Sequence, residues 1–329
     1  MIETGNRKEQ RSTRNIIQIV SRYKGLSAQE ISTQFKDGGI YADKAAWAKF
    51  IDILLLSLGV AFTIAGTIFF FAYNWDELHK FVKLGVVQFL ILAGVTAVFL
   101  FKSNQLIKNV LLTATSMLVG LLFSVFGQIY QTGADAYDFF LGWTVFVLLW
   151  AVVSAFPPLW LLLLTLINIT FSLYVSQTGP DWTAVTTYLI LAIVNLAAII
   201  LVKFLALKNF IVTVPAWFEK IVVIMVVSCL TISLVGGIYS KYQAEWFLAL
   251  AAGVVFYAGG IGYALRHKSI YLLCLIPLST IIILVALVLD IFKVDNEFIF
   301  LLIGLVIVAC ITLLVRELAK LNKAWHGDN

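Results

Sequence analysis

From Ile53 onward, long apolar stretches alternate with short polar breaks. A helix needs about 20 mostly apolar residues to cross a bilayer, and each stretch has close to that length. The pattern therefore predicts an all-α protein, a polytopic transmembrane helical bundle with about ten spans. The predicted spans are 53–73, 84–101, 109–126, 139–156, 159–176, 184–202, 221–239, 246–265, 269–289 and 298–315.

The division between the fourth and fifth spans rests on a proline pair. As one helix, residues 139–176 would run for about 57 Å at 1.5 Å per residue, which is far longer than a bilayer crossing. Pro157 and Pro158 remove two successive backbone donors and disfavour helix just before them. We expect two spans joined by a tight hairpin, with a re-entrant pair as the alternative.

Lysine and arginine divide unequally between alternate connections. With the N-terminus inside, 19 of the 23 basic residues lie in internal segments and 4 in external ones. In membrane proteins, the cytoplasmic loops are enriched in lysine and arginine. One span too many or too few would reverse the side assigned to every later loop, and the bias would be lost. The bias predicts two cytoplasmic termini, with a helical N-terminal region at 1–50, a transmembrane domain at 51–316 and a tail at 317–329.

The N-terminal region carries a helix signature. Residues 27–30 (Ser-Ala-Gln-Glu) fit a capping box, and Gly38-Gly39 fits a helix end. A helical hairpin at the membrane surface is one interpretation of residues 1–50, and a docking module for a protein partner or anionic lipid is the other. No basic run with interleaved aromatic residues is present, so we expect no nucleic-acid partner.

The composition of the chain argues against several classes of function. With 61% hydrophobic and 12% charged residues, the 329-residue chain is not expected to be a soluble enzyme. None of the 41 charged residues falls inside the predicted spans, which argues against a buried proton relay or a voltage sensor. Amides and hydroxyls do enter the spans, and we expect them to form hydrogen bonds between helices. They include Gln88, Thr165, Asn168, Thr170 and Asn195.

Polar and aromatic residues gather at the predicted external ends of the spans. Amides, carboxylates and aromatic rings occur there together, which exceeds an ordinary aromatic belt. A cleft of this composition suits a sugar, a cationic head group or a lipid-linked molecule. The candidate ligand-binding residues are Asn74, Trp75, Asp76, His79, Gln128, Tyr130, Gln131, Asp135 and Trp143.

Asp76 and His79 are spaced to share a helical face, as metal or catalytic residues can be. A metal site needs at least a third ligand, which would have to come from another loop. No zinc-protease, nucleophile-elbow, phosphate-loop or paired CxxC motif is present. We therefore predict no metal, no cofactor and no catalytic residue.

Two stretches resemble the bacterial predicted-membrane-protein family called domain of unknown function 2157. The first runs from Gly59 and Gly66 to the Phe-Phe-Ala-Tyr-Asn-Trp sequence at 70–75, followed by Lys83-Leu84. The second is Gly-Gln-Ile-Tyr-Gln at 127–131, with Asp135 and Trp143. The resemblance covers residues 15–160 approximately. It implies a bacterial inner-membrane location, and it points to Asn74, Trp75, Gln128 and Tyr130.

Three functions remain open. The first is a non-enzymatic protein that binds or moves a small or lipid-like ligand from an extracytoplasmic cleft. The second is a structural or accessory subunit that docks through its N-terminal helices. The third is a membrane-embedded enzyme that acts on an envelope lipid or glycan with Asp76, His79 or Asp135. We expect the first. An inverted repeat would support a carrier, but residues 74–83 have no counterpart after the sixth span.

Overall fold

The computed structural model describes residues 27–37, 44–73, 79–100, 105–130, 133, 135–179, 181–208, 214–240, 244–292 and 297–326. Within these residues, all regular structure is helical, as the apolar pattern predicts. The chain divides into two compact units, Met1–His79 and Lys80–Asn329.

The first unit contains helices α2 (Ala28–Asp37) and α3 (Lys44–Tyr73). The predicted capping box is confirmed: the Ser27 amide donates to the Glu30 carboxylate at 2.8 Å, and the Glu30 amide donates to the Ser27 hydroxyl at 3.3 Å. These bonds satisfy two amides at the start of α2. Helix α3 is continuous across the predicted boundary between residues 50 and 51, and its apolar part runs from Trp47 to Phe70.

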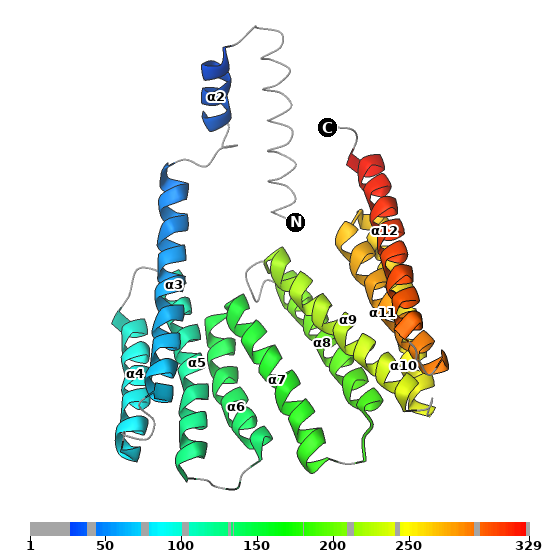
Figure 1. Ribbon diagram of the computed structural model, residues 1–329. Helices are drawn as coiled ribbons and strands as arrows, with labels where there is room; N and C mark the ends of the chain where they lie inside the picture. Colours follow the sequence, from blue (N-terminus) through cyan, green and yellow to red (C-terminus); the bar gives the residue numbers. More distant parts are fainter. Residues whose placement is uncertain are drawn as a thin grey trace. The chain divides into compact units, whose positions relative to one another are not determined.

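The second unit contains nine described helices (Figure 1). Each predicted span from the second to the tenth falls within one of them, to within two residues. They are α4 (Lys80–Leu100), α5 (Gln105–Tyr130), α6 (Ala136–Ser154), α7 (Pro157–Thr178), α8 (Ala184–Leu207), α9 (Ala216–Tyr239), α10 (Ala244–His267), α11 (Ile270–Phe292) and α12 (Glu297–His326).

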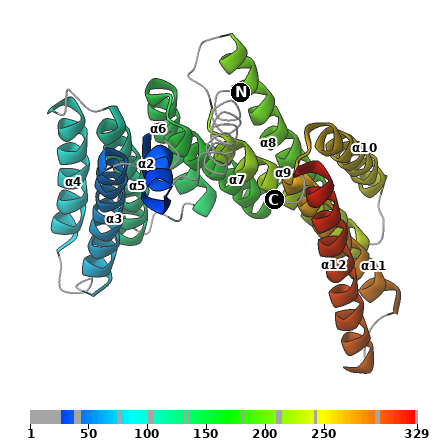
Figure 2. The same ribbon diagram turned by 90° about the horizontal axis from the view of Figure 1, so that it is seen from above.

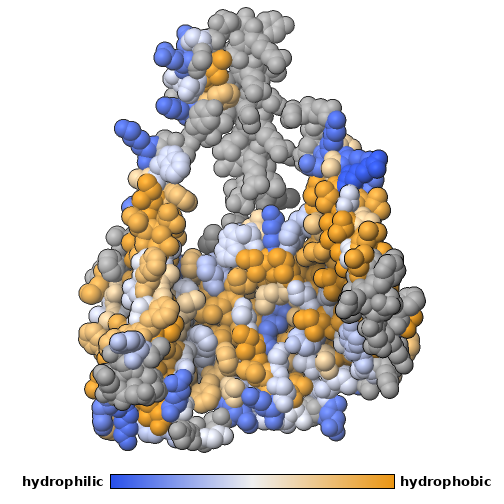
Figure 3. All heavy atoms as spheres, in the orientation of Figure 1, coloured by the Kyte–Doolittle hydropathy of each residue, from blue (hydrophilic) through white to orange (hydrophobic). Residues whose placement is uncertain are grey.

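By length and composition, nine helices of the described chain are able to cross a membrane, α3 to α11. Helix α12 contains the tenth predicted span but is not among them, so the tenth crossing stays a prediction. Large apolar side chains project outward, with Phe99, Val153 and Leu207 exposing 74%, 83% and 82% of their area. On the face drawn in Figure 3, hydrophobic residues predominate along the helices, and most hydrophilic ones lie towards helix ends.

Helices α4 to α8 follow one another side by side (Figures 1 and 2). The C-terminal ends of α5 and α7 lie on the same side of this row, and the C-terminal end of α6 lies on the opposite side (Figure 1). Consecutive helices therefore alternate in direction.

The predicted break at the proline pair is confirmed. Ala155 adopts a left-handed conformation, with φ 47° and ψ 36°, and Pro157 begins α7. Proline suits this first helical position because its missing N–H would have no partner there. Across the hairpin, the Trp160 indole N–H donates to the Ala151 carbonyl at 2.8 Å.

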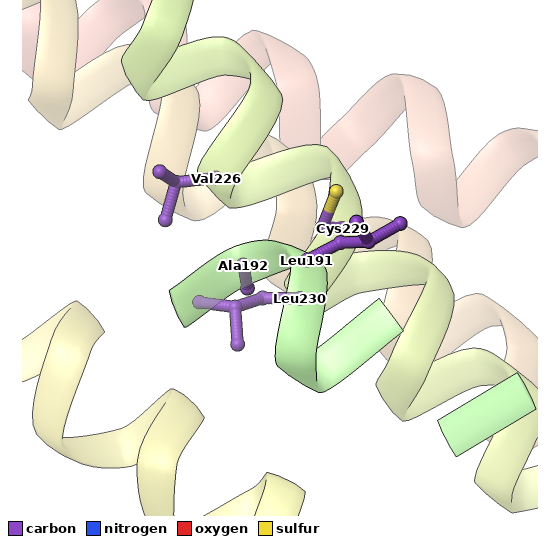
Figure 4. Close-up of a cluster of buried hydrophobic side chains, with 5 residues drawn as sticks. All are labelled: Leu191, Ala192, Val226, Cys229 and Leu230. Atoms are coloured by element: carbon purple, nitrogen blue, oxygen red, sulfur yellow. The ribbon is translucent and has the colours of Figure 1, made fainter. Parts of the chain in front are cut away.

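Helix α9 is the most buried of the candidate spans in the described chain. Its residues Val226, Cys229 and Leu230 pack with Leu191 and Ala192 of α8 (Figure 4). Helix α9 contacts α7, α8, α10 and α11, so it joins the two halves of the second unit.

Beside this cluster, two amides pair reciprocally. Asn168 of α7 donates to Asn195 of α8 at 3.0 Å, and Asn195 donates back at 2.8 Å. Asn195 is fully buried. The pair confirms the expected hydrogen bonding between helices.

Candidate functional site

The last turns of α5 and the first turns of α6 border a partly open cavity of about 390 Å³. Its walls are mainly aromatic rings, which come from Phe123 on α5 and from Phe139, Phe140 and Trp143 on α6. The polar side chains that line it are Ser124 and Gln128.

Glycines let the two helices approach closely beside this cavity. A Cβ atom on Gly120 would lie 2.5 Å from the Trp143 ring, and one on Gly127 would lie 2.6 Å from the Phe139 ring. The contact is reciprocal, since a Cβ on Gly142 of α6 would lie 2.9 Å from the Phe123 ring. Trp143 is also held by its indole N–H, which donates to the Ser116 carbonyl at 2.7 Å.

A second cavity, of about 500 Å³, lies between α4 and the same part of α5. Phe81, Leu84, Gly85 and Gln88 line it from α4, and Leu122, Phe123, Phe126 and Tyr130 line it from α5. Phe123 therefore borders both cavities.

The two cavities share a chemical character. Each has apolar walls and a single amide, Gln128 in the first and Gln88 in the second. Both amides are exposed, and neither makes a hydrogen bond within the described part of the chain. No carboxylate or amine is among the described residues that line either cavity. The site is therefore suited to holding an apolar body by shape and orienting it by hydrogen bonds.

Of the nine predicted ligand-binding residues, three line these cavities: Gln128, Tyr130 and Trp143. Asp135 caps α6 next to the lining residue Ala136, and its exposed side chain makes no capping hydrogen bond. His79 is exposed and belongs to the first unit. Asn74, Trp75, Asp76 and Gln131 lie outside the described residues.

The described residues bring no three histidine, cysteine, aspartate or glutamate side chains together in a group that could hold a metal ion. Near the start of α6, the Tyr137 amide donates to the Gln177 side chain at 2.9 Å.

The aromatic walls of the first cavity were not predicted from the sequence. Phe123, Phe139 and Phe140 were absent from the candidate residues, although they make up most of the first cavity. The available signal was the pair Gly120 and Gly127, seven residues apart on one face of α5, which marks a face where large rings approach the helix.

Long apolar helices with outward-facing hydrophobic side chains define a multi-pass α-helical membrane protein. Residues 18–160 match the family model described as "Predicted membrane protein (DUF2157)", which confirms the resemblance found in this part of the chain. Both cavities are lined by residues within the matched segment. No curated protein and no solved structure matches the chain.

Proposed function

We propose that this membrane protein binds or moves a small or lipid-like ligand, without chemical conversion, through the two cavities beside the end of α5. The observation that carries the proposal is the pairing, in each cavity, of apolar walls with one amide that has no hydrogen-bond partner in the described chain. Volumes of about 390 and 500 Å³ fall within the range of about 300–1,000 Å³ that is typical of small-molecule sites.

The ligand enters from the extracytoplasmic side of a bacterial inner membrane in this proposal. The excess of lysine and arginine in the alternate connections supports cytoplasmic termini. With that orientation, the α5–α6 connection and both cavity mouths face outward. Cysteine labelling tests this orientation. Single cysteines are introduced at Asp135 and at Asn322, each in a chain without its three native cysteines. An impermeant thiol reagent is expected to label the first in intact cells and the second only after lysis.

The binding test uses purified full-length protein in vesicles or detergent. We expect Gln128→Ala to abolish retention or uptake of the ligand, because it removes the amide that orients the ligand in the first cavity. The matched control is Gln105→Ala at the other end of α5, where Gln105 bonds to Asn109 at 3.1 Å and lines neither cavity. Equal ligand retention by both variants and the unaltered protein would contradict the proposal.

The N-terminal region supports a second candidate, an accessory subunit that docks through residues 1–50. Helix α2 is amphipathic, which gives a partner an apolar face to bind, and a complete capping box stabilises its first turn. Removal of residues 1–45 is then expected to release a co-purifying partner while the protein remains monodisperse. Retention of that partner after the deletion would contradict the docking role.

A further inference from the structure

The two cavities meet at one side chain. Phe123 lines both, with α6 on one side of it and α4 on the other. Its ring is held in place by Phe146, with ring centroids 5.9 Å apart, and by the close approach of Gly142. The site is thus two apolar compartments separated by a fixed aromatic ring.

The last turn of α5 supplies one hydrogen-bonding side chain to each compartment. Gln128 lines the first compartment and Tyr130 lines the second, and both lie in the last turn of the helix. An amide N–H and a phenolic O–H are hydrogen-bond donors, which suit ester and phosphate oxygens. Each apolar compartment therefore has a donor at the same end of α5.

We propose that the ligand is a two-chain lipid, a diacyl phospholipid of the surrounding bilayer. One acyl chain occupies each compartment, the Phe123 ring lies between the chains, and the head group contacts Gln128 and Tyr130. This inference rests on the proposed function and specifies its ligand.

The reason for two chains is physical. Lipid tails are as apolar as the cavity walls, so moving a chain from the bilayer into a cavity gains no hydrophobic free energy. Retention must come from shape and from the hydrogen bonds at the head group. A single-chain lipid fills one compartment and leaves the other without its contacts, whereas a diacyl lipid fills both.

The experiment compares a diacyl phosphatidylethanolamine with its single-chain lyso form, competing for purified full-length protein in detergent, with bound lipid measured by native mass spectrometry. Gly85→Leu blocks the second compartment without disturbing the packing, because nothing lies within 4 Å of a Cβ at Gly85. Gly262→Leu is the matched control: its Cβ also meets open space, and it lines neither compartment.

The unaltered protein and Gly262→Leu are expected to retain the diacyl lipid in preference to the lyso lipid. Gly85→Leu is expected to lose that preference and to retain both lipids equally. Gly85→Met repeats the test with an unbranched side chain, in case Gly85→Leu does not elute as a single species.

Two results would overturn the two-chain inference alone: equal retention of both lipids by the unaltered protein, or an unchanged preference in both Gly85 variants. Absence of both lipids from the unaltered protein, together with no effect of Gln128→Ala on any ligand, would overturn the proposed function as well.

Discussion

In the α5–α6 hairpin, Trp143 lies against Gly120, and its indole N–H donates to the Ser116 carbonyl at 2.7 Å. In the α9–α10 hairpin, Trp246 lies against Gly237 and donates to the Leu234 carbonyl at 3.0 Å. Both hairpins therefore use a tryptophan on the second helix, a glycine on the first, and a hydrogen bond to a carbonyl about one turn earlier.

The surroundings of the two contacts differ. Around α9–α10, aliphatic side chains close the interface, with Leu234, Ile238 and Ala249 exposing 3%, 1% and 0% of their area. Around α5–α6, flat rings surround the contact and leave a cavity of about 390 Å³. The glycine–tryptophan contact therefore holds each hairpin together, whereas the neighbouring side chains decide whether the interface closes completely or leaves room for a ligand.

The largest expected effect concerns the two glycines. A Cβ on Gly237 would overlap the Trp246 indole inside a closed interface, so we expect Gly237→Ala to lower the free energy of unfolding by about 3 kcal/mol. Gly120→Ala is expected to cost about 1 kcal/mol, because the Trp143 ring borders a cavity and has space to move. Thermal unfolding in detergent measures both, and equal losses would show that the cavity gives the Trp143 ring no room to move.

The next largest expected effect on stability comes from replacing two serines by leucine. Ser233 is fully buried and donates to the Val185 carbonyl at 2.8 Å, so Ser233→Leu is expected to cost about 2 kcal/mol through overpacking. Ser124 is exposed in the first cavity, and Ser124→Leu is expected to stabilise the fold by about 0.5 kcal/mol while it blocks ligand retention. A destabilised Ser124→Leu variant would show that this cavity has no room for a leucine.

Replacing two different amides is expected to affect stability in one case and ligand binding in the other. Asn195→Ala is expected to cost about 1–2 kcal/mol, because it leaves the Asn168 amide without its partner inside the bundle. Gln128→Ala is expected to change stability by less than about 0.5 kcal/mol, since Gln128 is exposed, and to abolish ligand retention.

A variant that replaces both Asn168 and Asn195 tests whether the two amides stabilise one another. Its loss of unfolding free energy is expected to be smaller than the sum of the single losses, because both single changes break the same two bonds. Additive losses would mean that the two amides do not stabilise one another.

The helices were predictable because their signals are local. Apolar runs of bilayer length located them, Pro157 located the start of α7, and the capping box located the start of α2. Each signal lies within the segment it describes, so no knowledge of neighbouring helices was needed.

The faces of the helices were not predictable in the same way. Asn168 and Asn195 bond between helices as expected, but Thr165 bonds to the Leu161 carbonyl of its own helix at 2.9 Å, and Gln88 lines a cavity. Helix α6 is apolar on all sides, so no amphipathic pattern marks the face that Phe139 and Phe140 present to α5. Which face meets a neighbour depends on packing between segments, which the chain order does not specify.

The smallest expected effect concerns the hydrogen bond that the two hairpins share. Replacing Trp143 or Trp246 by the benzothienyl analogue, in which sulfur takes the place of the indole N–H, removes the bond and keeps the ring shape. We expect a loss of about 0.6 kcal/mol at either position, the usual contribution of a hydrogen bond between membrane helices. Because the ring still fills the same space, the cavity beside Trp143 should make no difference here, in contrast to the glycine variants. A much larger loss at Trp246, measured by thermal unfolding in the same detergent, would show that burial strengthens this bond, and the two hairpins would then differ in the contact itself as well as in its surroundings.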